Sequence, residues 1–141
     1  MHMHMTEDDI TRHIIDSLGG GQFVVADDNT FFFHGADNKF PFATIVTKDD
    51  DFDSASKLNR LGVFRLNVGV GKETFRALFG EPDEASIANV DYAALDTLMP
   101  HPMYGKMHWV SVINPSSKTF EKVKPLLTEA RSLAAARDKS K

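Results

Sequence analysis

Three short runs rich in aromatic and β-branched residues constrain the fold more than any other feature of the chain. The first two runs, 23–26 and 30–34, flank Asp27-Asp28-Asn29, whose residue types tolerate the positive φ angles of a tight turn. A second turn-forming stretch at 35–39 leads into the third run, 42–48. The three runs predict consecutive antiparallel strands joined as a meander.

A helical pattern precedes these strands. Thr6 and Asp9 have the spacing of a capping box, and apolar residues recur at every fourth position from Ile10. The three glycines at 19–21 predict the end of this helix, because glycine readily adopts the left-handed conformation that closes a helix.

The remainder of the chain predicts shorter elements and one long terminal helix. In chain order they are a short helix at 54–61, a strand at 63–68, a helix through 75–79 that ends at Gly80, a helical turn at 91–99 and a last strand at 107–114. The terminal helix begins at 115–117. Within it, Pro125 predicts a kink or a delayed start, because proline removes an intrahelical hydrogen bond.

Together these elements predict an α+β fold. We expect a two-layer sandwich: a twisted antiparallel sheet of about five strands, with the N- and C-terminal helices packed on one face and the other face partly open. A length of 141 residues fits a single domain, which we expect to span 6–137. Residues 1–5 are expected to be an expression or start-site remnant or a disordered start, and 138–141 a disordered tail.

The composition excludes several classes of protein. The chain has no cysteine, which excludes disulfides and cysteine-built metal sites. No apolar run approaches the roughly 20 residues that a membrane span needs, and the start of the chain lacks the layout of a signal peptide. We therefore expect a cytoplasmic protein with no membrane partner and no cofactor, either a monomer or a weak homodimer.

Charge is distributed unevenly along the chain. The formal net charge is −4, yet residues 118–141 hold seven Lys/Arg against three Asp/Glu. A modestly basic tail on an acidic body is a weak indication of nucleic-acid binding, because such domains usually carry a pronounced basic face. A solvated terminal helix is the favoured interpretation of this tail.

One segment, 100–109, gathers rare residue types. It holds two of the six histidines, one of the two tyrosines and the only tryptophan. The candidates for ligand binding are His101, Tyr104, His108 and Trp109. Prolines and a glycine in the same segment would hold these side chains in a stiff turn, where histidine and tyrosine can bind a ligand or transfer a proton. The competing interpretation is structural, since tyrosine and tryptophan also anchor loops to a core.

A weaker candidate is an anion site at Gly69, Gly71 and Lys72. These residues lie between a predicted strand and a predicted helix, where backbone N–H groups can meet a phosphate. The phosphate-loop pattern requires Ser or Thr directly after the lysine, and Glu73 stands there. A simple turn into the helix is therefore favoured.

The acidic stretch 49–53 matches a calcium loop only in part. Asp49, Asp51 and Asp53 alternate as calcium ligands do, but Arg60 stands where the last ligand, a glutamate, would be. We expect no bound metal, with Asp49 and Asp51 as the weak remaining candidates. Asp53 is expected to cap the helix at 54–61.

Phe23 and the run Phe31–Phe33 suggest an aromatic platform on which nucleic-acid bases could stack. Because strand residues alternate between faces, Phe32 should point away from the face that carries Phe31 and Phe33. Packing in the core is the favoured explanation for most of these rings.

Linked motifs of the chain resemble a family pattern. They are Pro41–Lys48 (PFATIVTK), Gly62–Val68 (GVFRLNV) and His101–Gly105 (HPMYG), followed by Trp109 and Asn114-Pro115. Over residues 6–137 they resemble an uncharacterised bacterial family, a domain of unknown function, which implies no activity, cofactor or substrate.

A more distant resemblance rests on His108-Trp109, placed in a strand before a helix from Ser117 onward. In this the chain is similar to MmcQ/YjbR-like proteins, a resemblance that implies a frataxin-like α+β sandwich and a proposed role in DNA binding. The acidic body and the inserted region at 81–99 depart from that pattern.

Three functional hypotheses remain after the sequence analysis. The first is a non-enzymatic binding module that holds a small molecule in a polar-aromatic pocket near 100–109. The second is an enzyme in which His101 or His108 is the general base and a carboxylate such as Asp49 or Asp51 orients it or binds a metal. The third is nucleic-acid binding of the MmcQ/YjbR type through the C-terminal Lys/Arg residues.

Overall fold

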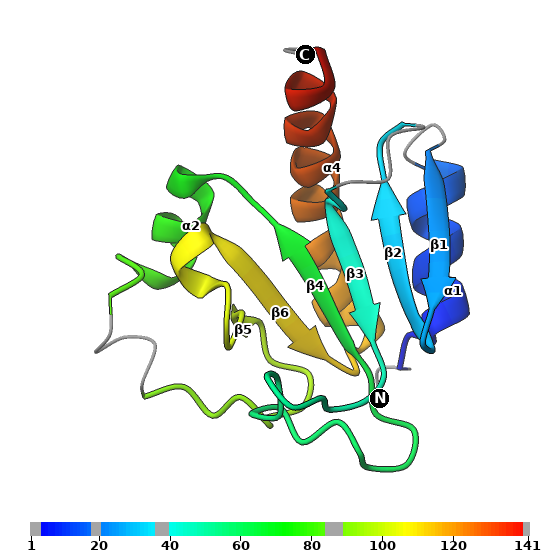
Figure 1. The fold of residues 1–141 in the computed structure, drawn as a ribbon. Coiled ribbons are helices and arrows are strands. Elements are labelled where there is room, and N and C mark those ends of the chain that lie inside the picture. The colour runs from blue at the N-terminus through cyan, green and yellow to red at the C-terminus, as the bar shows by residue number, and fades with distance from the viewer. Residues whose placement is uncertain (1–3, 18–20, 36–39, 84–88, 140–141) are drawn as a thin grey trace.

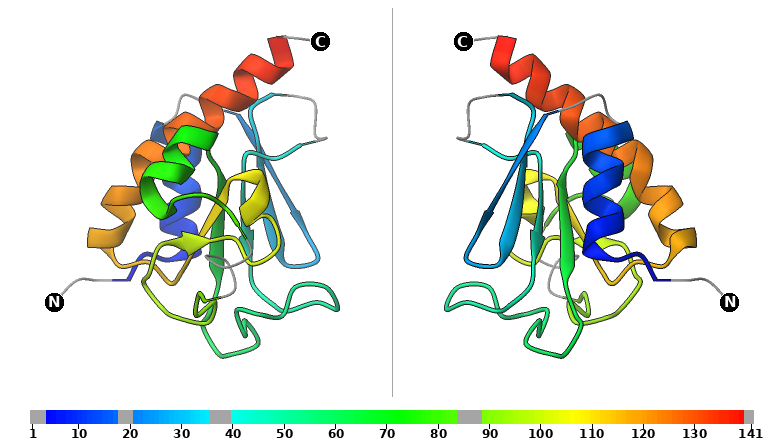
Figure 2. Two further views of the ribbon diagram at one scale, coloured as in Figure 1. Left: turned by 90° about the vertical axis from the view of Figure 1, so that its left-hand side faces the viewer. Right: turned by 90° about the vertical axis from the view of Figure 1, so that its right-hand side faces the viewer.

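The protein folds around one antiparallel sheet with the strand order β1-β2-β3-β4-β6-β5. The structure, a computed structural model, describes residues 4–17, 21–35, 40–83 and 89–139. Helices α1 and α4 cover one face of the sheet (Figures 1 and 2). The predicted α+β class and the helices on one face are thereby confirmed.

The first two strands form the predicted hairpin. β1 (Gln22–Ala26) and β2 (Asn29–Phe33) are joined by Asp27 and Asp28, whose φ angles are 54° and 65°. Two successive positive φ angles produce the turn whose twist matches that of paired strands. β3 (Ala43–Val46) pairs antiparallel with β2, so the predicted meander is confirmed.

The sheet has six strands rather than about five. β4 (Arg65–Gly69) and β6 (Trp109–Ile113) continue it beyond β3, and β5 (Met99–Pro100) adds an edge against β6. Sequence analysis assigned 91–99 to a helical turn, which was wrong. The described residues there form turns and a bend before β5, which is too short to carry a strand pattern of its own.

The predicted terminal helices are present. α1 (Glu7–Arg12) begins with the capping box: the Asp9 N–H donates to Thr6 Oγ1, and the Thr6 N–H donates to Asp9 Oδ2, both at 3.1 Å. A π-helical turn, η1 (His13–Ser17), extends it. The predicted stop at 19–21 falls largely on residues 18–20, which lie outside the described part.

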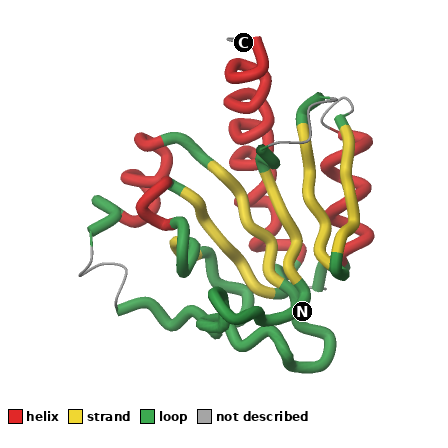
Figure 3. The backbone as a smooth tube through the Cα atoms, in the orientation of Figure 1, coloured by secondary structure: helices red, strands yellow, loops and turns green. Residues whose placement is uncertain are grey.

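The C-terminal helix is longer than any other helix of the described chain. α4 (Ser117–Lys139) continues through Pro125 without a second start. Ser116 caps it, accepting a hydrogen bond from the Thr119 N–H at 3.2 Å. Figure 3 shows this helix running behind the strands along the sheet. In the described ranges, no helix combines the length and the apolar character required to cross a bilayer.

The predicted helix at 54–61 is absent, and an irregular loop lies in its place. Backbone N–H groups of this loop bond to side chains instead of to a helical ladder: Asp49 Oδ1 accepts from Leu58 N at 2.8 Å, and Asn59 Oδ1 accepts from Asp49 N at 3.1 Å. Asp53, expected to cap that helix, is paired elsewhere. This loop leaves the sheet on the side away from α1 and α4 (Figure 2).

Alternation along the strands separates an apolar face from a polar one. Leu66 and Val68 of β4, and Val110 and Val112 of β6, are buried in the core cluster with side chains of α4 such as Leu127. The intervening residues therefore project from the opposite face. That second face is where the polar side chains of the inner strands gather.

Helix α2 (Lys72–Phe79) is connected to α4 through one carboxylate. Glu129 of α4 accepts hydrogen bonds from the Gly71 N–H at 2.7 Å and from the Thr74 hydroxyl at 2.6 Å. Gly71 is the N-cap residue and has no side chain with which to cap the helix. Glu129 thus performs the capping from another helix.

We predict that Glu129→Ala lowers the free energy of unfolding by about 1–2 kcal/mol, the usual cost of a lost helix cap. Urea unfolding followed by circular dichroism measures the change. Glu121→Ala is the control on the same helix: Glu121 pairs with Lys124 at the surface, and its loss should cost no more than about 0.5 kcal/mol. Equal effects of the two substitutions would contradict the capping role.

Candidate ligand-binding site

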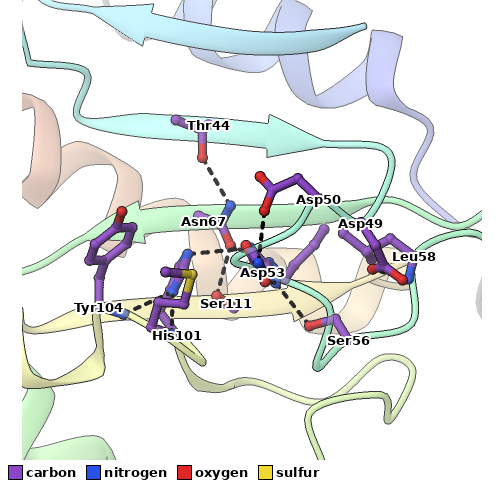
Figure 4. Close-up of polar contacts among 12 residues, drawn as sticks. Thr44, Asp49, Asp50, Asp53, Ser56, Leu58, Asn67, His101, Tyr104 and Ser111 are labelled. Atoms are coloured by element: carbon purple, nitrogen blue, oxygen red, sulfur yellow. Dashed lines mark hydrogen bonds and ion pairs between the residues drawn. The ribbon is translucent and has the colours of Figure 1, made fainter. Parts of the chain in front are cut away.

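A row of polar side chains crosses three of the inner strands on the face opposite the helices. Thr44, Asn67 and Ser111 are aligned in register on β3, β4 and β6. Asn67 Nδ2 donates to Thr44 Oγ1 at 2.9 Å, and Ser111 Oγ donates to Asn67 Oδ1 at 2.7 Å. Figure 4 shows this row with His101 and Asp53 beside it.

Arg65 lies next to this row and is fully buried, with no exposed area. Its Nε donates to Asn67 Oδ1 at 2.8 Å, and its Nη1 donates to Asp53 Oδ1 at 3.0 Å and to Ser56 Oγ at 2.9 Å. Its Nη2 donates to Asp53 Oδ2. Asp53 therefore meets the guanidinium with both oxygens, which is the strongest geometry for such a pair.

The surroundings of Asp53 act on its pKa in opposite directions. Partial burial raises the pKa, whereas hydrogen bonds and charge attraction from Arg65 lower it more, so the net pKa lies below its usual value. The carboxylate stays ionised at neutral pH and balances the buried cation. The result is an ion pair that fixes the loop containing Asp53 against β4.

His101 completes the group from the other side of Arg65. It is buried, with 4% exposure, and its Nδ1 lies 3.0 Å from both the Met103 N and the Tyr104 N. Its Nε2 lies 3.3 Å from Arg65 Nη2. Burial first, and the Arg65 charge second, lower the pKa of His101 to about 3 against the opposing effect of Asp53, so the imidazole is neutral.

A hollow of about 580 Å³ lies over this group on the open face of the sheet. Of the side chains described above, its polar wall includes Thr44, Asp53, Arg65, Asn67 and His101. The rest of its lining includes apolar and aromatic side chains, among them Phe31, Phe52, Met103, Tyr104 and Trp109. The volume fits a small molecule.

The structure brings together three of the four residues singled out in the 100–109 segment. His101, Tyr104 and Trp109 all line the hollow. The Tyr104 ring lies 4.9 Å from the His101 ring between centroids and is 47% exposed, so it lies at the rim. Trp109 packs its indole against Gly69, where an added Cβ would come within 2.9 Å of the ring.

His108 does not face this hollow. It closes a short 3-10 turn, η2 (Gly105–Met107), with a left-handed φ of 69°. Its ring packs edge-on against Phe75 of α2, with 5.7 Å between centroids. His108 therefore lies apart from the group around His101, although only seven positions separate the two histidines in the sequence.

The candidate anion site at Gly69, Gly71 and Lys72 contains a carboxylate of the chain itself. Glu129 holds the Gly71 N–H, which is the group an external anion would approach. Gly69 is engaged by the Trp109 indole. The Gly71 N–H is therefore bound by a carboxylate of the chain itself.

One of the two weak metal candidates, Asp49, has a hydrogen-bond partner within the chain. Asp49 accepts from the Leu58 N–H, and the neighbouring Asp50 Oδ1 accepts from Phe52 N and Asp53 N at 2.7 Å each. Among the described residues, no group of three or more His, Asp or Glu side chains could hold a metal ion. Asp49 and Asp51 are thus not gathered into a ligand set there.

The aromatic residues of the hairpin divide between the faces. Phe32 is fully buried in the core cluster on the helix side, as alternation predicts, while Phe31 lines the hollow. Phe33 is buried. Phe23 of the edge strand is 47% exposed, and its ring lies 6.2 Å from the Phe32 ring between centroids. The rings therefore do not form one continuous platform.

Sequence analysis missed Arg65, Asn67 and Ser111 as parts of the site. One signal was present: Arg65 and Asn67 alternate with apolar residues in a strand that proved central, where a charge has to be paired. Nothing local indicated that the partner would be Asp53. That pairing joins residues twelve positions apart through a loop with no regular structure.

Comparison with known proteins identifies a family whose function is unknown. A family model described as a family of unknown function, DUF6194, matches residues 5–141. No curated protein and no solved structure matches the chain. The expected uncharacterised family is confirmed, whereas bacterial origin and the likeness to MmcQ/YjbR-like proteins stay predictions.

We predict that Asp53→Asn lowers the free energy of unfolding by about 3 kcal/mol, because it leaves the Arg65 charge buried without a counter-charge. Asp51→Asn is the matched control in the same exposed loop and should change stability by less than about 0.5 kcal/mol. Urea titration of both variants measures the difference. A neutral result for Asp53→Asn would show that the ion pair does not hold the loop.

The free energy of unfolding should depend on pH through the titration of His101. Its pKa is 6.5 in the unfolded chain and about 3 in the folded protein, so between those values only the unfolded state binds the proton. Stability is therefore complete above pH 6.5 and falls as the pH drops toward 3, by up to about 1.4 kcal/mol per pH unit.

Unfolding free energies measured across that pH range provide the check. The variant His101→Asn lacks the titrating ring and should show a shallower slope. Burial also lowers the pKa of His13, which contributes equally to both proteins. Identical slopes for the two proteins would mean that His101 titrates normally in the folded state.

Proposed function

The chain belongs to DUF6194, a family of unknown function, and on that premise we propose that it is a non-enzymatic binding module. Its ligand is a small molecule that occupies the hollow beside the 100–109 segment. The proposal takes the protein to be cytoplasmic and a monomer or weak homodimer.

The observation that carries this proposal is the contrast between the two parts of the hollow. Its polar wall is held by paired, buried side chains, among which Arg65 has no exposed area and His101 only 4%. Its rim carries exposed apolar side chains: Phe52 is 83%, Tyr104 47% and Met103 42% exposed. A preformed polar wall under an apolar rim is the usual composition of a small-molecule site.

Fixed geometry supports binding for a second reason. The polar wall is built on inner strands, and the short turn that presents His101 is closed by its own backbone hydrogen bonds, including Gly105 N to His101 O at 3.0 Å. A site that is ordered before the ligand arrives loses less conformational entropy on binding.

The enzyme hypothesis receives less support. In the described ranges, neither His101 nor His108 hydrogen-bonds a carboxylate. A pKa of about 3 makes His101 a poor proton acceptor at neutral pH, because an efficient general base titrates near the working pH. Its Nδ1 is also occupied by two backbone donors.

No specific observation on the described residues favours the nucleic-acid hypothesis. The net charge is −4, and Lys124 of the basic terminal helix pairs with Glu121 at 2.9 Å. Binding of that type would weaken steeply as salt rises, which separates it from occupation of the hollow.

We predict that a panel of metabolites and nucleotides contains compounds that raise the melting temperature and shift the fluorescence of Trp109, the only tryptophan. Saturation at 100 times the Kd stabilises the fold by about 2.7 kcal/mol. Thermal unfolding identifies the compounds, and the indole, which lines the hollow, reports their location.

Two glycine variants provide the matched test of location. Gly69→Ala would place a Cβ within 2.9 Å of the Trp109 ring and must displace it, whereas Gly71→Ala meets Glu129 at an ordinary 3.5 Å. Binding should weaken in the first variant and persist in the second. A panel without any stabilising compound, or binding unaffected by Gly69→Ala, would refute the proposed site.

A further inference from the structure

His101 lines the hollow and carries on Nε2 a proton for which the described chain supplies no acceptor. We propose that the hollow binds a neutral, ring-bearing ligand whose carbonyl oxygen accepts a hydrogen bond from His101 Nε2–H. The inference rests on the proposed binding function and names the chemical class of the ligand.

The position of the His101 proton follows from its backbone partners. Met103 N and Tyr104 N both lie 3.0 Å from Nδ1, and a backbone N–H can only donate. Nδ1 must therefore offer its lone pair. A neutral imidazole carries one proton, so that proton resides on Nε2.

Nε2–H then faces a second donor. Arg65 Nη2 lies 3.3 Å away and has no lone pair to offer. The guanidinium directs its other N–H groups at Asp53, Ser56 and Asn67, so the N–H beside His101 is the one left without an acceptor. Two buried donors that face each other are unfavourable, and a ligand oxygen that accepts from Nε2–H would give one of them a partner.

Charge around the hollow selects a neutral acceptor over an anion. Asp53 already balances Arg65, so the cation is not available to attract a second carboxylate. The same loop adds Asp49, Asp50 and Asp51, and Asp50 itself lines the hollow. An anionic group would enter an acidic environment, whereas the oxygen of an amide or a lactam would not be repelled.

The body of the ligand is indicated by the rim. Phe31 and Trp109 line the walls, and Phe52, Tyr104 and Met103 stand exposed at the edge. Flat apolar surfaces on several sides suit an aromatic or heteroaromatic ring, which aromatic side chains contact in stacked or edge-on geometry. A carbonyl attached to such a ring reaches the polar wall while the ring stays among these side chains.

The test compares benzamide with benzoate and toluene, which share a ring and differ in the acceptor group. Titration of the full-length protein, followed by Trp109 fluorescence, should give at least about tenfold tighter binding of benzamide than of either other probe, the effect of one well-placed hydrogen bond. Tighter binding of benzoate than of benzamide would overturn the neutral-ligand assignment.

Two variants separate the roles of the two imidazole nitrogens of His101. In His101→Asn the side-chain oxygen takes the place of Nδ1 and keeps the turn closed. The same substitution removes the Nε2 donor. His101→Gln retains a donor near the place of Nε2. Benzamide affinity should fall about tenfold in His101→Asn and stay within about threefold in His101→Gln. Unchanged affinity in His101→Asn would overturn the proposal.

The tautomer can be read without any substitution. Long-range ¹⁵N–¹H spectra of the wild-type protein should show His101 protonated on Nε2, with the Nε2 proton shifting when benzamide is added. Protonation on Nδ1 would overturn the proposal. If none of the three probes binds while other panel compounds do, the ligand chemistry is wrong and the binding function stands; if no panel compound binds, the binding function itself fails.

Discussion

The ion pair between Arg65 and Asp53 is the interaction on which the open face of the protein depends. A guanidinium with no exposed area on an inner strand would be very costly alone, so the chain has to bring a carboxylate to it. The only way to do so from residue 53 is to fold the 47–63 loop back over the sheet. Ser56 and Asn67 then accept hydrogen bonds from two further donors of the same guanidinium. The conformation of this loop is determined by pairing with a buried charge and not by helical backbone hydrogen bonds.

The location of His101 follows from the same constraint. β5 pairs with the outer side of β6, and the turn after it delivers the imidazole to the guanidinium. The ring is held there by backbone groups of its own turn and kept neutral by burial and by the neighbouring cation. A hollow with a fixed polar wall and a neutral imidazole results, and for this reason we propose binding rather than acid–base chemistry.

The parts of the structure that sequence analysis predicted are those determined by neighbouring residues. The Thr6–Asp9 cap, the Asp27-Asp28 turn and the glycine end of α2 involve residues within a few positions of one another. The irregular loop was mistaken for a helix because Asp53 resembles a local cap while its partner lies twelve residues away. His101 was predicted as a site residue because rare residue types lie beside it in the sequence. Asn67 and Ser111 were missed because they become a site only when β4 and β6 pair.

The contact between Trp109 and Gly69 has a mechanical consequence. Gly69 is followed at once by the segment whose Gly71 N–H is fastened to Glu129, and the indole also borders Leu133 and Ala136 of α4 across a second hollow. Because Trp109 lines both hollows, a shift of its indole would change the shape of the hollow on the open face and of the one that α4 borders.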